Sequence, residues 1–440
     1  MSPKSRGRPP GRGRAKRSSG SPRELRLSDI ALRDARRIVA VDDPLQAELW
    51  VSGWLGQAWL TATLRERDAE RRFVTELAGR VRAHPTPHGR AALEALRRVC
   101  DEQEREVLTG VLTGPAAAQP APAWTDRVDL VAGDDGEPEV GPESVRGEWV
   151  PGAAWRSEDV WGGDRVLFVE FDGPSPHTLM ARISDVAGAF VETLDVLRPG
   201  AAEEWSRLRA EDPDAVPMPL RALPAVEVLA DLADVLRVTD MTLPRNEDEE
   251  FVRTRALAWA RCRAYLPGFG ELAASSEDER RELAADFARS GEIIDDEVTR
   301  SLTEIFLDYG TGYLGGGPLA WGPTAVELFL TYYVPRKVVL DAAQRHRLPG
   351  ALRAWIRFAL TRRGVEPRWI ARAVEAVDES LPEFEEAFDD ASTWGPAKQI
   401  VTELEARGVD LSDRETVERA MRELNAERLA RDRQEGRFDR

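Results

Sequence analysis

The chain has 440 residues, a length that favours about two to four domains. Hydrophobic residues make up 42% and charged residues 32%, a composition that is typical of globular proteins and excludes disorder over most of the chain. The net charge of −17 is unevenly distributed, because residues 1–23 carry +8 and no acid, which leaves −25 on the remainder.

The cysteines and histidines exclude several classes of site. Cys100 and Cys262 lie too far apart for a disulfide framework, and no Cys/His spacing suits zinc. The N-terminus lacks the apolar stretch of a secretory signal. The longest uncharged run, residues 309–326, is interrupted by glycines and prolines, so no transmembrane helix is predicted. We therefore expect a cytoplasmic protein with no cofactor and no metal.

Residues 28–113 are predicted to form a helical domain. Asp43 followed by Pro44 is typical of a helix start, because aspartate caps the first amides and proline suits the first helical position. Within that helix, Gly53 and Gly56 would let a neighbouring backbone approach closely. Further helices are expected after it, up to residue 113.

In the middle of the chain the spacing of apolar residues no longer follows the helical pattern. Residues 114–158 are rich in proline, glycine, alanine and acids, and predict a linker. Residues 159–200 contain short apolar runs separated by turns such as Asp172-Gly173-Pro174, which predicts an antiparallel β-meander of three strands. Because three strands alone are marginally stable, helices should cover one face.

Helical periodicity returns over residues 201–440, which are predicted to form a larger helical C-terminal domain whose last ten or so residues fray. Asn246 is predicted to cap a long helix, and Ser276 with Glu279 forms a capping-box pair. The predicted fold class is therefore α+β, predominantly α-helical. Trp321-Gly322-Pro323 and Trp394-Gly395-Pro396 each precede a helical segment, which fits either a duplicated unit or two separate helix starts.

Residues 1–27 have too few apolar side chains to fold and are predicted to be a disordered basic arm. Its Arg6-Gly7-Arg8-Pro9 core resembles the AT-hook, a short motif that binds the DNA minor groove, although Ser5 replaces the proline common before it. Two arginines flanking a glycine can lie along a narrow A·T groove, where the negative potential is deepest. The other basic residues would neutralise phosphates. The predicted nucleic-acid-binding residues are Lys4, Arg6, Gly7, Arg8, Pro9, Arg12, Arg14, Lys16 and Arg17.

An alternative interpretation of the arm comes from the composition. Of the 61 basic residues only four are lysine, a bias that is typical of a G+C-rich genome. The arm could then be a solvated tail that binds nothing in particular, or one that binds RNA or another polyanion.

A glycine-rich segment matches the spacing of a dinucleotide-binding loop at Gly310, Gly312 and Gly315. Such a loop must follow a strand, whereas a helical segment precedes this one, so a connection between helices is predicted instead.

Two further clusters have structural explanations. The acids at residues 292–297 surround a helix start, where the helix dipole favours negative charge without a metal. His177 near Asp185 lacks a Ser or Cys nucleophile in a recognisable elbow, so no catalytic residue is predicted. Cys262 is expected to be a core thiol, and the 13 tryptophans are expected to anchor the core.

The body resembles proteins of high-G+C bacteria (actinobacterial type) that have no established function. The resemblance lies in residues 43–56, the hairpin with His177, Trp321-Gly322-Pro323 and residues 408–411, and it implies no role for any residue.

The first hypothesis is thus a non-enzymatic binding protein, with a helical body that contacts an unknown protein and an arm that contacts A·T-rich double-stranded DNA at the nucleoid. The alternatives are a cytoplasmic scaffold whose arm is incidental, and an enzyme with an unrecognised site.

Overall fold

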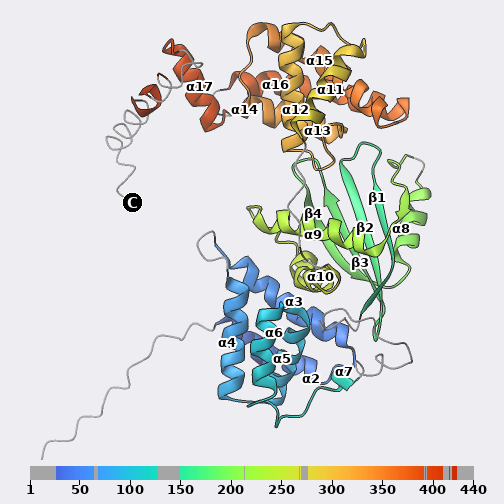
Figure 1. Cartoon of the computed structure of the whole chain (residues 1–440), viewed down its shortest axis with the longest axis vertical. Coiled ribbons are helices and arrows are strands. Elements are labelled where there is room, and N and C mark those ends of the chain that lie inside the picture. The colour runs from blue at the N-terminus through green and yellow to red at the C-terminus, as the bar shows by residue number, and fades with distance from the viewer. Residues whose placement is uncertain are drawn as a thin grey trace, which may run out of the picture.

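The computed structural model describes residues 26–63, 68–126, 149–212, 214–266, 268, 276–390, 392, 394–409, 416 and 419–423. The described chain forms three tiers along its longest axis: N-terminal helices, a sheet with its covering helices, and C-terminal helices (Figure 1). This arrangement confirms the predicted α+β fold class with a predominance of helix. None of the described helices is long and apolar enough to cross a membrane.

The first tier is a bundle of short helices around a shared apolar core. Asp43 caps α3 as predicted, since its side chain accepts a hydrogen bond from the Leu45 amide at 2.9 Å. The helical stretch predicted to run to residue 113 is interrupted at Cys100, because Asp101 caps a new helix through the Glu104 amide. The helices are α1 (Leu27–Asp34), α2 (Arg36–Val39), α3 (Pro44–Leu60), α4 (Ala69–Ala83), α5 (Pro87–Val99), α6 (Glu102–Leu112) and α7 (Ala123–Asp126).

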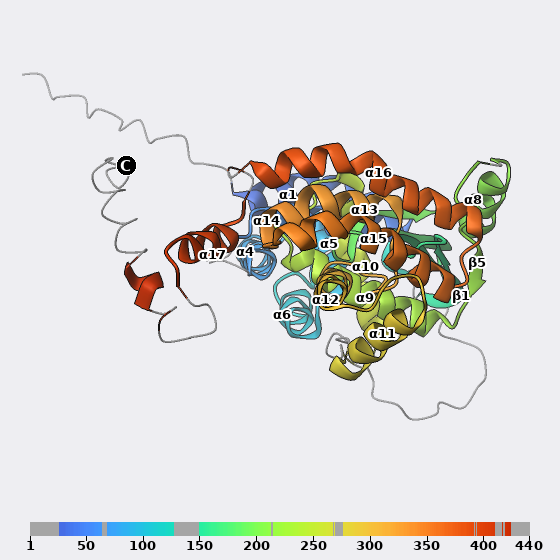
Figure 2. The same cartoon turned by 90° about the horizontal axis from the view of Figure 1, so that it is seen from above.

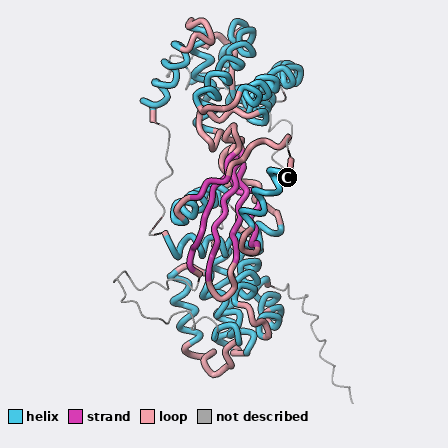
Figure 3. Tube along the Cα trace, turned by 90° about the vertical axis from the view of Figure 1, so that its right-hand side faces the viewer, coloured by secondary structure: helices cyan, strands magenta, loops and turns pink. Residues whose placement is uncertain are grey.

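The middle tier contains a five-stranded antiparallel sheet with strand order β4-β3-β2-β1-β5. The strands run roughly along the long axis of the molecule (Figure 3). They are β1 (Val150–Glu158), β2 (Asp164–Asp172), β3 (His177–Ser184), β4 (Phe190–Leu197) and β5 (Leu220–Ala222).

The sheet is larger than the predicted three-stranded meander. β1 occupies residues 150–158, inside the segment predicted to be a linker, and it pairs along β2 with a register shift between Pro151 and Ala154. The proline, glycine and small residues of β1 do not show the alternation of apolar and polar residues that is typical of a strand. Pairing with β2 stabilises the strand despite this low local propensity.

Both faces of the sheet are covered. On one face, Leu167, Val169 and Phe171 of β2 pack with α9 (Ala225–Met241) and α10 (Glu249–Tyr265). On the other face, Val166 and Phe168 pack with α8 (Ala201–Ala210). Figure 1 shows α8 on the side opposite to α9 and α10. Helices α8 to α10 therefore belong with the sheet, although the sequence placed them in the C-terminal helical domain.

Asn246 does not cap α10, contrary to the prediction. Asp248 caps it instead, through the Phe251 amide at 2.9 Å. The Asn246 side chain donates to the carbonyls of Val191 and Glu192, both at 2.9 Å. It thereby satisfies acceptors on the edge strand β4, which would otherwise invite pairing with another strand.

Helix α10 joins the sheet to the first tier by crossing α3 closely. A Cβ at Gly56 would lie 2.0 Å from the Val252 carbonyl oxygen, so only glycine permits this crossing. A Cβ at Gly53 would meet only the Arg253 side chain, at 3.7 Å. The close approach predicted from both glycines is thus confirmed at Gly56.

The third tier packs its helices around an aromatic core that includes Trp321 and Trp355. The predicted capping box of Ser276 and Glu279 is present, and both Trp-Gly-Pro tripeptides precede helices. Helix α17 projects from the side of the tier beyond α14 (Figure 2). The elements are α11 (Glu277–Arg289), α12 (Glu297–Gly312), α13 (Pro323–Leu328), a π-helical turn (Phe329–Tyr333), α14 (Val334–Lys337), α15 (Ala342–Arg362), α16 (Pro367–Asp389) and α17 (Pro396–Ala406).

Candidate functional site

The residues predicted to bind DNA, from Lys4 to Arg17, lie outside the described residues. The candidate sites that can be placed in the structure are therefore those of the body. Two of them, which share several residues, lie around α10 where it meets the first tier.

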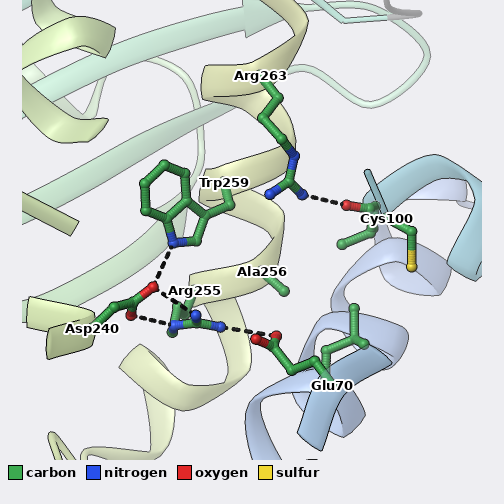
Figure 4. Close-up of a pocket in the computed structure, with 9 residues that line it drawn as sticks. Glu70, Cys100, Asp240, Arg255, Ala256, Trp259 and Arg263 are labelled. Carbon is green, nitrogen blue, oxygen red and sulfur yellow. Dashed lines mark hydrogen bonds and ion pairs between the residues drawn. The ribbon is translucent and has the colours of Figure 1, made fainter. Parts of the chain in front are cut away.

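A cavity of about 230 Å³ lies between α10 and the helices of the first tier (Figure 4). Three of its residues, Arg255, Trp259 and Arg263, are spaced four apart on α10 and so share one face of that helix. The remaining lining comes from α3, α4, α9, α10 and the end of α5: Leu55, Glu70, Val99, Cys100, Asp240 and Ala256. The cavity is thus assembled from segments that are far apart in the sequence.

Arg255 is held by two carboxylates at one end of this cavity. Its Nε and Nη2 donate to the two oxygens of Asp240 at 2.6 and 2.7 Å, and its Nη1 donates to Glu70 at 2.9 Å. The Trp259 indole donates to Asp240 at 3.1 Å. The carboxylates raise the pKa of Arg255 although burial opposes them. Both carboxylates are therefore bound to Arg255, and the triad forms a wall of the cavity.

A second cavity of about 270 Å³ lies on the other side of the same triad and shares Glu70, Asp240 and Arg255 with the first. The Trp59 ring lies beneath two guanidinium groups, of Arg245 at 4.4 Å and Arg255 at 4.6 Å. Met241 and Leu243 also line it.

Cys100 is the one thiol in the lining of the first cavity. Burial raises the pKa of Cys100 well above its usual value, and the negative charge of Glu104 raises it further. A thiol that stays protonated is a poor nucleophile, so this residue does not suit covalent catalysis. Cys262 is fully buried, as expected of a core thiol, and its sulfur contacts the Leu229 carbonyl.

A buried charge cluster lies beside the first cavity, on the sheet side of α10. Glu48 is 1% exposed, accepts from Arg261 Nη2 at 2.6 Å and accepts from the Trp149 indole at 3.0 Å. Arg98 lies 3.8 Å from the same carboxylate. These contacts join α3 and α5 of the first tier to α10 and the start of the sheet.

The structure does not bring His177 and Asp185 together. His177 Nδ1 lies 3.0 Å from the Ser175 carbonyl, and its ring stacks on Phe171. Asp185 instead accepts from Arg165 Nε at 2.8 Å. Burial raises the pKa of Asp185 to about 6, against the opposing effect of Arg165. These contacts give both residues structural roles and no shared chemistry.

The glycine-rich segment after α12 binds the sheet. The Gly315 amide donates to the Asp185 carbonyl at 2.6 Å, and a Cβ on Gly315 would lie 2.2 Å from the Asp185 carboxylate. A Cβ on Gly316 would lie 2.2 Å from the Gly162 carbonyl. Gly315 and Gly316 therefore serve close packing between the second and third tiers, in a connection between α12 and α13. The predicted connection begins later than expected, because Gly310 and Gly312 lie within α12.

The acids at the start of α12 are paired with arginines. Asp296 caps the helix through the Thr299 amide at 2.9 Å and contacts Arg347 at 3.0 Å. Asp295 pairs with Arg300 at 2.7 Å. Within the described ranges, no group of three or more His, Cys, Asp or Glu residues could hold a metal ion. Helix capping and ion pairing account for these acids.

Sequence reasoning did not identify Glu70, Asp240, Arg255 and Arg263 as a group. The spacing of Arg255, Trp259 and Arg263 was the available signal, since it puts a stripe of polar and aromatic side chains on one face of a predicted helix. The two acids come from α4 and α9 and follow no sequence pattern that links them to α10.

Comparison with known proteins provides no relative from which a role could be transferred. No protein-family model matches the chain. Neither a curated protein nor a solved structure matches it.

Proposed function

We propose that this is a non-enzymatic binding protein that contacts A·T-rich double-stranded DNA through its N-terminal arm, while its body contacts a protein. The observation that carries the proposal is the separation of charge along the chain. The first 23 residues carry +8 without an acid, and the remainder carries −25. Phosphates attract the first part and repel the second.

The ion pairs of the body support this division. The buried arginines Arg165, Arg255 and Arg261 all have carboxylates within ion-pair distance. If such an arginine turned to a phosphate, its carboxylate would stay buried without a counter-charge. Breaking a buried ion pair in this way costs about 3–5 kcal/mol. Residues 1–23 of the arm, in contrast, contain no acid to compete with phosphate.

In this proposal the arm has two kinds of residue. Arg6 and Arg8, on either side of Gly7, enter the minor groove and prefer A·T because that groove is narrow and strongly negative. The remaining basic residues contact phosphates and add affinity without sequence preference. A cytoplasmic protein with such an arm would associate with the nucleoid.

The test is a gel-shift series on A·T-rich and G·C-rich duplexes at several salt concentrations. The full chain should bind with a steep salt dependence, up to a slope of about −7 if all eight positive charges of residues 1–23 contact phosphates. Deletion of residues 1–23 should abolish binding. If the truncated chain binds as the full chain does, or if neither binds in dilute buffer, the proposal is wrong and the arm is incidental to a scaffold.

The chain offers a charge-matched control for the groove contact. The variant R6A/R8A and the variant R12A/R14A each remove two arginines that flank a glycine, but only the first pair precedes a proline in the motif. Both should reduce the salt slope by about 2. Only R6A/R8A should lose the preference for A·T, and equal loss in both variants would refute the minor-groove assignment.

A further inference from the structure

Arg263 is an arginine in the first cavity that has no acidic partner among the described residues. We propose that this cavity binds a small organic carboxylate, with Arg263 as the residue that recognises its negative charge. This site is separate from the arm, and its test does not depend on DNA binding.

The hydrogen bonds of Arg263 leave most of its donors unused. Nη2 donates to the Val99 carbonyl at 2.8 Å, and this is its only hydrogen bond within the described part of the chain. Nε is buried there without a partner. A guanidinium carries five N–H donors, so a planar carboxylate would satisfy groups that the protein leaves unpaired.

The charge of Arg263 is also uncompensated. Burial lowers the pKa of Arg263, and the opposing electrostatic effects of Cys100, Asp101 and Glu70 are too weak to reverse this decrease. The two carboxylates that line the cavity, Asp240 and Glu70, are bound to Arg255. The two carboxylates share one guanidinium, so the triad carries a net charge of −1 at its end of the cavity. Because Cys100 stays protonated, the charge at the other end is the positive charge of Arg263, which has no carboxylate within ion-pair distance among the described residues.

The shape of the cavity favours an apolar body behind the carboxylate. Arg263 and Arg255 are eight residues apart on α10, about 12 Å at the helical rise, and Figure 4 shows Ala256 between them. Leu55, Val99 and the Trp259 ring supply apolar surface along this length. A volume of about 230 Å³ is below the range of about 300–1,000 Å³ that is typical of pockets for drug-sized ligands, and it suits a compact molecule of a few carbons.

The alternative of a cationic ligand is less compatible with these contacts. A cation would have to compete with Arg255 for Asp240, which accepts from Arg255 at 2.6 and 2.7 Å and from Trp259 at 3.1 Å. It would also lie in the field of Arg263. An anion bound at Arg263 displaces no ion pair and lies beside a positive charge, with the net negative triad at the other end of the cavity.

The experiment is a ligand-observed NMR titration of the full chain with butyrate, together with acetate and benzoate as smaller and larger carboxylates. Butyramide, which has nearly the same shape and no charge, is the ligand control. We expect at least one carboxylate to bind, and butyramide to bind at least tenfold more weakly than butyrate. If no carboxylate binds up to about 50 mM, or if butyramide matches butyrate, the proposal is overturned.

Two variants locate the site. Arg263→Gln should weaken carboxylate binding at least tenfold, whereas Arg253→Gln, which removes an exposed arginine paired with Glu250 on the same helix, should leave it unchanged. If Arg263→Gln fails to fold, Ala256→Met tests the same site by filling the cavity, and it should abolish binding with little change in the melting temperature. Unchanged binding in a folded variant of either kind would refute the assignment.

Discussion

The protonation of His177 provides a sharp test of the buried cluster between α10 and the sheet. His177 is 2% exposed, and its ring lies 5.3 Å from that of Phe171 and 5.0 Å from that of Trp149. Burial, followed by the positive charge of Arg261, lowers the pKa of His177 to about 4. Asp43 and Glu48 act in the opposite direction and do not offset this effect. The folded protein therefore holds the imidazole neutral.

The sign of the resulting pH dependence follows from the two pKa values of His177. In the unfolded chain a histidine titrates near 6.5, so between pH 6.5 and pH 4 the unfolded state binds a proton that the folded state does not. This histidine's contribution to stability is complete above pH 6.5 and is lost progressively as the pH falls toward 4. The shift corresponds to a loss of about 2 kcal/mol between pH 8 and pH 5.

The assay compares urea unfolding of the wild type and His177→Leu at pH 8 and pH 5, followed by circular dichroism and tryptophan fluorescence. Leucine cannot be protonated. The free energy of unfolding of the variant should therefore decrease by about 2 kcal/mol less than that of the wild type between pH 8 and pH 5. Asp159 and Asp185, whose pKa values burial raises to about 6, contribute with the opposite sign, but they are common to both proteins and cancel.

One result would refute this reasoning. If the stability difference between the wild type and His177→Leu is the same at pH 8 and pH 5, His177 is not held neutral by its surroundings. The packing of β3 against Trp149 and Arg261 would then be looser than the structure shows.

Two further substitutions test the contacts between the tiers. Glu48→Gln should destabilise the protein by about 3 kcal/mol in urea unfolding, because Arg261 would stay charged and buried. Replacing both residues by methionine should recover only part of the loss, because Arg98 and the Trp149 indole also contact this carboxylate. Gly56→Ala should cost about 1–3 kcal/mol in the same assay, because its Cβ would lie 2.0 Å from the Val252 carbonyl. Gly53→Ala, with its nearest contact at 3.7 Å, should be neutral or stabilising; equal effects of the two alanines would contradict the close helix crossing.

Features that depend on neighbouring residues in the sequence were predicted well. The Asp43 cap, the capping box of Ser276 with Glu279 and the helix start at Pro323 all depend on groups within one helical turn. The predicted close approach at Gly56 is also present. At the caps and the helix start, the chemistry of a few consecutive residues determines the local backbone. At Gly56 the sequence indicates only that a backbone approaches closely, and the partner, Val252, is distant in the chain.

Features that depend on distant partners were missed. β1 has few apolar alternations of its own and becomes a strand because β2 pairs with it along most of its length. Asn246 looked like a helix cap, but its side chain binds the carbonyls of β4, more than 50 positions earlier. The cavity beside α10 unites α3, α4, α5, α9 and α10, and no spacing within a single segment encodes that meeting.

Arginine content alone cannot identify a functional arginine in this chain, since arginine replaces lysine almost everywhere. Helix α10 shows what distinguishes one arginine from another. Arg255 and Arg261 have carboxylate partners that account for them, whereas Arg263 has a single backbone carbonyl and unused donors facing a cavity. A similar comparison applies to the arm. Its minor-groove assignment holds only if Arg6 and Arg8 confer a preference for A·T that Arg12 and Arg14, with the same charge, do not confer. Both proposals are therefore decided by pairs of variants that remove the same charge at two different positions.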